Sequence, residues 1–139
     1  MNWKLTAAAF CFSAGVISTP AQGLKVKVQV PFAFEVANKT MPAGEYEVWS
    51  ERNEVLLRNV DGIIVAMQQS NRVVRYGGKS GQVVFHCYES HCFLSQLWTP
   101  DAEQGREVLE SKSEREIAKH QEPQQFALLG KGQGRPSGK

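Results

Sequence analysis

Alternation of apolar and polar residues over 30–48 constrains this chain more than any other feature of its sequence. Phenylalanine and valine recur at every second position over 32–36, and the same period resumes over 46–48. The residues between, 38–44, are rich in asparagine, proline and glycine, which favour turns. A period of two residues is typical of a strand with one buried face. The segment therefore predicts two strands joined by a turn.

The same period continues on both sides of this segment. Leu24 and three valines alternate with lysine and glutamine over 24–30, and Pro31 after them predicts an edge strand or a bulge because proline cannot donate to a strand ladder. Residues 55–60 and 63–69 flank Asp61-Gly62, a pair that favours a tight hairpin turn. Further strands are expected over 45–50, 72–76, 82–88 and 92–99. About seven to eight short strands predict an all-β fold, an antiparallel sandwich or a small barrel.

The last third of the chain predicts one helix and then disorder. Ser111 and Ser113 each precede a glutamate by three residues, the spacing of a helix capping box, and favour a short surface helix over about 113–120. Residues 123–139 are rich in glutamine, glycine and proline and carry basic residues, which predicts a disordered basic tail. The β domain is thus expected over 24–122.

The first 23 residues resemble a cleaved secretory signal. Lys4 precedes an apolar run over 5–17, and small residues follow over 19–23. A permanent membrane anchor fits less well, because the run is about 13 residues long and a spanning helix needs ~20. We therefore expect a secreted or periplasmic protein. Loss of Lys4 lowers the formal net charge from +2 to +1, which argues against nucleic-acid binding by the whole domain.

Two histidines and two cysteines cluster within seven residues: His86, Cys87, His91 and Cys92. These residue types are ligands of zinc, but residues 86 and 87 point to opposite faces of a strand, which disfavours a shared metal site. If residues 88–91 form a hairpin loop, Cys87 and Cys92 face each other at a separation that suits a disulfide. Export also favours oxidation of the two cysteines that follow the signal. Free thiols and a metal or redox site stay open as alternatives.

No catalytic residues or cofactor are expected. The sequence has no nucleophile elbow and no helix-borne histidine pair. A cysteine nucleophile at position 87 or 92, activated by a neighbouring histidine, is the enzyme alternative. Trp49 has the opposite parity to its buried neighbours, so we expect it on the outer face, partly exposed, as a candidate partner surface.

The motif VPFAFEVANKTMPAGEYEV over 30–48 resembles the opening of an uncharacterised family of small exported acidobacterial proteins. The resemblance extends to 84–86, 93–98, 105–106 and 111–116 in the same order. Members of that family usually have a glycine in the turn between the strands that correspond to 82–88 and 92–99, where this chain has Glu89-Ser90. The cysteines that flank this turn here are not a feature of the family. The PAGxY portion over 42–46 is also similar to carboxypeptidase-regulatory-like and transthyretin-like sandwich modules, which implies an accessory role by fold analogy.

Together these features predict a non-enzymatic binding or structural module at the cell envelope. Its expected partner is an envelope protein or a polysaccharide rather than nucleic acid. The alternative function is a metal- or thiol-dependent activity at the hairpin that carries His86, Cys87, His91 and Cys92.

Overall fold

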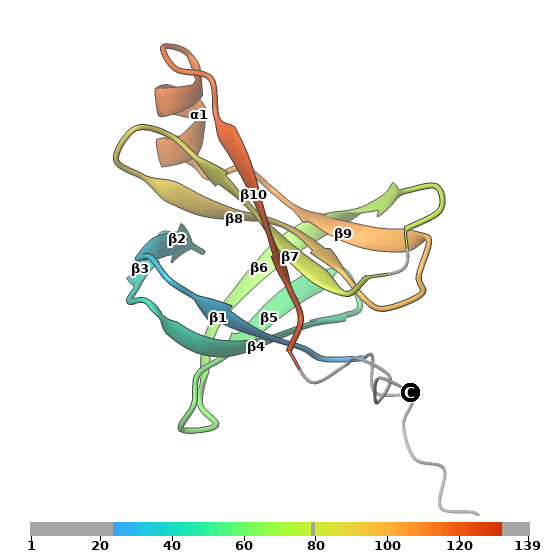
Figure 1. Cartoon of the computed structure of the whole chain (residues 1–139). Helices are drawn as coiled ribbons and strands as arrows, with labels where there is room; N and C mark the ends of the chain where they lie inside the picture. The colour runs from blue at the N-terminus through green and yellow to red at the C-terminus, as the bar shows by residue number, and fades with distance from the viewer. Residues whose placement is uncertain (1–23, 79, 132–139) are drawn as a thin grey trace, which may run out of the picture.

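Strands dominate the computed structural model, which describes residues 24–78 and 80–131 (Figure 1). In chain order the elements are β1 (Val26–Val30), β2 (Phe34–Val36), β3 (Lys39–Met41), β4 (Gly44–Glu51), β5 (Glu54–Arg58), β6 (Ile64–Val74), β7 (Gln82–Cys87), β8 (Cys92–Trp98), β9 (Gln104–Val108), α1 (Lys112–Ala118) and β10 (Gln124–Leu129). The predicted all-β class with one short late helix is confirmed. The expected signal peptide, 1–23, lies outside the described residues. The described helix is too short and too polar to cross a membrane.

The strands form one mixed sheet rather than the purely antiparallel one that was expected. Its order is β1-β4-β5-β6-β9-β8, and β8 pairs on its other side with β7, which in turn pairs with β10. The small β2–β3 hairpin joins β8 beside β9, and β2 runs parallel to β8 there. Strand β6 connects the two halves, because it pairs with β5 up to Gln69 and with β9 from Ser70 onward.

The segment over 30–48 folds as one hairpin inserted into another. Strands β1 and β4 pair antiparallel, with Val28 opposite Tyr46, so the alternation predicted from the sequence is confirmed. The connection is more elaborate than the single turn expected, because β2 and β3 form their own hairpin within it. Ala37 and Asn38 close that inner hairpin with φ angles of 52° and 61°, in the left-handed region that tight hairpin turns use. Pro31 follows β1, which lies at the edge of the sheet as the proline predicted.

One apolar core lies between the two halves of the sheet. The Phe34 ring packs edge-on against Tyr46 of β4 and against Phe85 of β7, at 5.2 Å from each ring centroid. Valines from β1, β4, β5 and β7 fill the space around these rings. The core therefore fixes β2 between the β1–β4 layer and the β7–β8 layer (Figure 1).

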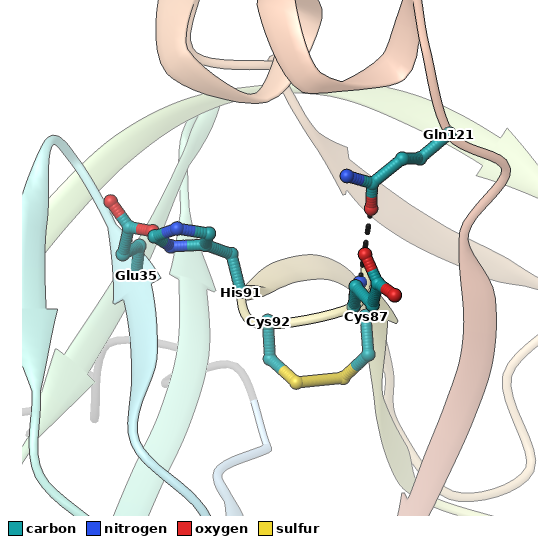
Figure 2. The surroundings of a disulfide bond; sticks show 6 residues. Glu35, Cys87, His91, Cys92 and Gln121 are labelled. Carbon is teal, nitrogen blue, oxygen red and sulfur yellow. Dashed lines mark hydrogen bonds and ion pairs between the residues drawn. A yellow bond between two sulfur atoms is a disulfide. The ribbon is translucent and has the colours of Figure 1, made fainter.

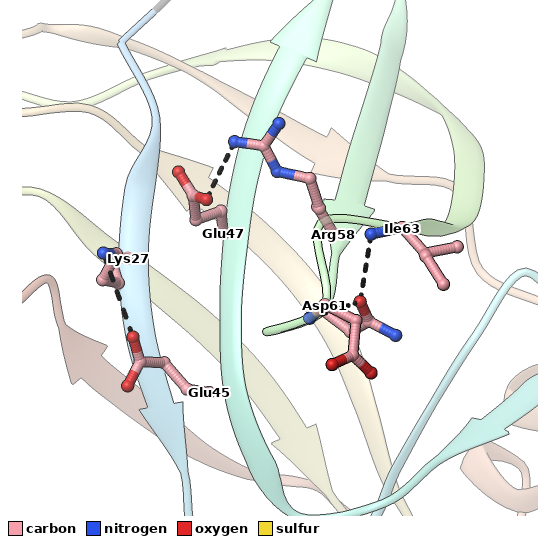
Figure 3. Close-up of polar contacts among 7 residues, drawn as sticks. Lys27, Glu45, Glu47, Arg58, Asp61 and Ile63 are labelled. Carbon is pink, nitrogen blue, oxygen red and sulfur yellow. Dashed lines mark hydrogen bonds and ion pairs between the residues drawn. The ribbon is translucent and has the colours of Figure 1, made fainter.

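One predicted turn and one predicted strand differ in detail. Asp61-Gly62 belongs to a longer loop in which the Asn59 side-chain oxygen accepts hydrogen bonds from the backbone N–H groups of Asp61 and Ile63, at 3.0 and 3.1 Å (Figure 3). The Asn59 side chain thus helps to stabilise a turn that was expected to form from Asp61-Gly62 alone. Residues 72–76 do not form a separate strand, because β6 runs on without interruption to Val74.

The chain end differs most from its prediction. The helix spans Lys112–Ala118 instead of 113–120, and the Ser111 hydroxyl caps it by accepting from the Glu114 N–H at 3.1 Å. Residues 124–129 were expected to be disordered, but they form β10 along β7. Strand β7 supplies the backbone hydrogen-bond partners of β10, and the glutamine-rich sequence of 124–129 gives no local sign of this pairing. The rest of the expected tail, 132–139, lies outside the described residues.

Candidate functional site

The late hairpin places Cys87 and Cys92 directly opposite each other and joins them by a disulfide (Figure 2). Their Cα atoms are 4.0 Å apart. The Tyr88 N–H donates to the His91 carbonyl at 2.7 Å, so the loop between the strands is closed by a tight turn at Glu89-Ser90. The disulfide predicted from the spacing is therefore present. Its sulfur atoms are bonded to each other and are not thiolate ligands.

The two histidines of the predicted cluster lie apart and have different partners. His91 Nδ1 lies 3.0 Å from a Glu35 carboxylate oxygen, and its ring stacks on Phe93. This contact ties the hairpin to β2 (Figure 2). His86 lies on the other face of β7, away from the disulfide, beneath α1. Among residues 24–78 and 80–131, no three histidine, cysteine, aspartate or glutamate side chains gather as a metal site.

A buried carboxylate attaches α1 to the outer face of β7. Glu114 is 4 % exposed and accepts a hydrogen bond from the Tyr88 hydroxyl at 3.1 Å. His86 Nδ1 lies 3.5 Å from the same carboxylate oxygen, and His86 Nε2 lies 3.3 Å from the Ser95 hydroxyl. Two partners thus satisfy a charge that would be costly to bury alone.

The electrostatics of this network follow from the buried carboxylate. The hydrogen bond to Glu114 raises the pKa of His86, and burial of the imidazole opposes part of that rise. Burial, reinforced by the Glu114 charge, raises the pKa of Tyr88 to about 12. The order carboxylate, imidazole, hydroxyl is that of a hydrolytic triad, but Ser95 is only 5 % exposed and lies within the packed sheet. We interpret the network as the attachment of α1 to the sheet.

Trp49 is on the outer face of β4 as its parity predicted, but the expectation of partial exposure is wrong. Its ring is 4 % exposed because Lys25 and Arg58 lie over it, at 4.9 and 5.3 Å from the centroid. Arg58 is held there by Glu47, with Nη2 2.8 Å from the carboxylate oxygen (Figure 3). The two cations shield the tryptophan from solvent, so it presents little surface to a partner.

The structure brings together a second site that the sequence analysis missed, at one end of the space between the sheet halves. Arg72 of β6 lies directly opposite Arg106 of β9, and Arg106 lies opposite Leu97 of β8. Leu97 belongs to the core, so this row faces inward. Arg52, from the β4–β5 turn, lines the same cleft of about 240 Å³. We call it the arginine cleft; its other lining residues are Ser50, Leu97, Thr99, Gln104 and Gly105.

The Arg106 guanidinium is held in a fixed orientation. Its Nε donates to the Ser70 hydroxyl at 2.9 Å, and its Nη2 donates to the Ser70 carbonyl at 2.8 Å. Nη2 also lies 3.4 Å from the Asn53 side-chain oxygen, and the Ser70 hydroxyl donates to the Asn53 carbonyl at 3.0 Å. Buried Ser70 therefore joins β6, β9 and the β4–β5 turn behind Arg106.

The three arginines of the cleft have no acidic partner among the described residues. No aspartate or glutamate lines the cleft, and the ion pairs of the described part of the chain do not include Arg52, Arg72 or Arg106. Like charges directly opposite each other on paired strands are destabilising. Arg52 also has a φ of 55°, a conformation that is unfavourable for a side chain of this size. The cleft thus concentrates positive charge in an arrangement that is unfavourable for stability.

The separation of these arginines in sequence explains why they were missed. Residues 52, 72 and 106 come from three different elements, and no short motif links them. The alternation along β6 places Arg72 on the inward face, and this was the one sign of the cleft in the sequence. It could be used only if β6 was known to continue past Ser70.

No family model matches the chain, and comparison with curated proteins and with solved structures also gave no match. The resemblance to small exported acidobacterial proteins therefore stays a prediction.

Proposed function

We propose that this protein is a non-enzymatic binding module of the cell envelope and that it binds an anionic polysaccharide in the arginine cleft. One observation carries the proposal. Arg72 and Arg106 oppose each other on paired strands and face a cleft without any lining carboxylate. An anion bound between them would convert a like-charge repulsion into two attractions.

The chemistry of the cleft favours carboxylate ligands. Guanidinium groups donate two parallel hydrogen bonds to a carboxylate, and a planar donor held in advance loses less entropy on binding. Ser70 fixes Arg106 through Nε and Nη2 and leaves Nη1 to face a ligand, while exposed Arg52 and Arg72 can adjust and supply the paired hydrogen bonds. Ser50, Thr99 and Gln104 add hydroxyl and amide groups that suit the hydroxyls of a sugar. Uronic acid units combine both features, so we propose them as the ligand class.

A secreted or periplasmic location is part of the proposal. The disulfide between Cys87 and Cys92 supports it, because disulfides persist in oxidising compartments outside the cytosol. Acidic polysaccharides are accessible to a protein in those compartments. The signal-like segment at 1–23 supports the same location from the sequence.

Titration calorimetry tests the proposal. The mature protein should bind an oligomer of galacturonic acid and should not bind a neutral galactose oligomer of the same length. Added salt should weaken the binding, because exposed ion pairs are screened. Equal binding of the acidic and the neutral oligomer, or binding of neither, would contradict the proposal.

A further inference from the structure

Strand β10 presents an open edge. Among the described residues β10 pairs with β7 alone. Just beyond the strand, the Gly130 N–H donates to the carbonyl of Gly81, the residue before β7, and the Lys131 N–H donates to the carbonyl of Lys27 in β1 on the opposite side. Because backbone groups alternate sides along a strand, the odd-numbered residues direct their N–H and C=O groups away from β7. Those residues within β10 are Gln125, Ala127 and Leu129.

This edge lacks the features by which soluble proteins protect edge strands. The sequence of β10 is QQFALL, without a charged residue or a proline, and five of its six residues are exposed. The other two edges differ. Strand β1 carries Lys27 and is followed by Pro31, and β3 has only three residues, one of them Lys39. Charge, proline and shortness prevent pairing with another chain. Strand β10 is therefore the edge that is free to pair.

Apolar side chains are exposed along the same edge. Phe126 lies opposite core-facing Phe85, yet it is 44 % exposed, because β1 meets the open side of β10 only beyond its end, at Lys131, and among the described residues no strand pairs with β10 beside Phe126. Leu129 on the other face is 64 % exposed. The Phe126 ring already contacts Phe32, at 6.2 Å between centroids. One more strand beside β10 would cover these side chains and occupy the free backbone groups together.

We infer that β10 pairs antiparallel with β10 of a second copy of this chain, around a two-fold axis near Phe126. An uncharged strand can face itself without repulsion. Glu122 precedes β10 and Lys131 follows it, so antiparallel pairing brings the acidic end of one strand toward the basic end of the other. Parallel pairing would bring like charges together. Closed two-fold dimers are also the commonest form of self-association.

The pairing extends the sheet across the dimer. In an antiparallel pair, directly opposed residues point to the same face. A two-fold axis near Phe126 therefore places the two phenylalanine rings on one face, where aromatic cross-strand pairs are favourable. The arginine cleft lies at β4, β6 and β9, which are not part of this edge. The dimer is thus independent of anion binding by the cleft.

Sedimentation equilibrium of the mature wild-type protein over a wide concentration range tests this inference, with two variants. We expect a concentration-dependent species of twice the monomer mass. Ala127→Pro removes an N–H that faces the open edge and leaves the pairing with β7, since proline is tolerated on edge strands in this orientation. Gln125→Lys places a charge on the edge. Both variants should remain monomeric at concentrations where the wild type is dimeric.

Gln69→Lys is the matched control for Gln125→Lys, because it makes the same change on interior strand β6. It should dimerise like the wild type. A wild-type protein that stays monomeric throughout would overturn the inference, and so would dimers that persist in Gln125→Lys. If Ala127→Pro does not fold, Gln125→Lys against Gln69→Lys still decides the question.

Discussion

Replacing Arg52 by glycine should make this protein more stable and a poorer binder of anions. Arg52 has a φ of 55°, and a left-handed conformation costs a non-glycine residue roughly 1–2 kcal/mol. Glycine avoids that cost, but its greater freedom in the unfolded chain takes back about 0.4–1 kcal/mol. The expected net gain in the free energy of unfolding is therefore about 1 kcal/mol. Loss of the Arg52 charge near Arg72 and Arg106 should also raise the free energy of unfolding.

Denaturant unfolding and thermal melting measure this gain directly. A change of about 1 kcal/mol should raise the melting temperature by roughly 3–6 °C for a domain of this size. Affinity for a galacturonic acid oligomer should fall in the same variant, because one of three guanidinium groups is lost. Stability and binding thus change in opposite directions, as is common where a binding site holds unfavourable features.

Arg52→Gln separates the two causes. Glutamine removes the charge but keeps a long side chain at the left-handed position, so it should weaken binding and give only the part of the stability gain that comes from loss of the charge. If Arg52→Gly is no more stable than Arg52→Gln, the conformational part of the reasoning is wrong. If Arg52→Gly binds the anionic oligomer as tightly as the wild type, Arg52 is not part of the binding site.

Three further predictions concern the late hairpin and α1. Replacing Cys87 and Cys92 by serine should lower the free energy of unfolding by about 2 kcal/mol, as expected for a short closed loop, and thiol titration of the oxidised protein without residues 1–23 should find no free thiol. Because the pKa of His86 is raised in the folded protein, protonation of His86 adds to the free energy of unfolding. The contribution is fully present below pH 6.5 and should disappear as the pH rises through the folded-state pKa. The difference in free energy of unfolding between wild type and His86→Gln, measured over that pH range, tests this. Tyr88→Phe leaves Glu114 with one donor fewer and should cost about 1–3 kcal/mol in chemical denaturation, and spectrophotometric titration should lose the tyrosine with a pKa of about 12.

The strands could be predicted where one face is buried and the other is wet. Strand β1 alternates buried valines with exposed polar residues, so its period is visible in the sequence. Strand β10 was missed because glutamines and a preceding proline resemble a disordered segment in composition. Its structure depends on β7, which is far away in sequence. Long-range pairing of this kind leaves no local signal.

Residues of the site could be predicted only where the partners that they contact are close in sequence. Cys87 and Cys92 are near neighbours across a hairpin, so their spacing was enough to predict the disulfide. Glu114 could be predicted as part of a helix cap, but its burial against Tyr88 follows from how α1 packs on the sheet. Trp49 had the expected parity, and only the structure shows the two cations that cover it.

The affinity of Arg72→Gln for a galacturonic acid oligomer tests the central claim most directly. Arg115→Gln is the matched control, because Arg115 is exposed on α1 and the substitution makes the same change in charge. Charge-assisted hydrogen bonds contribute about 1.5–3 kcal/mol each, so Arg72→Gln should weaken binding by roughly tenfold or more. Arg115→Gln should bind like the wild type. Equal affinity of the two variants would show that the arginine cleft is not the binding site.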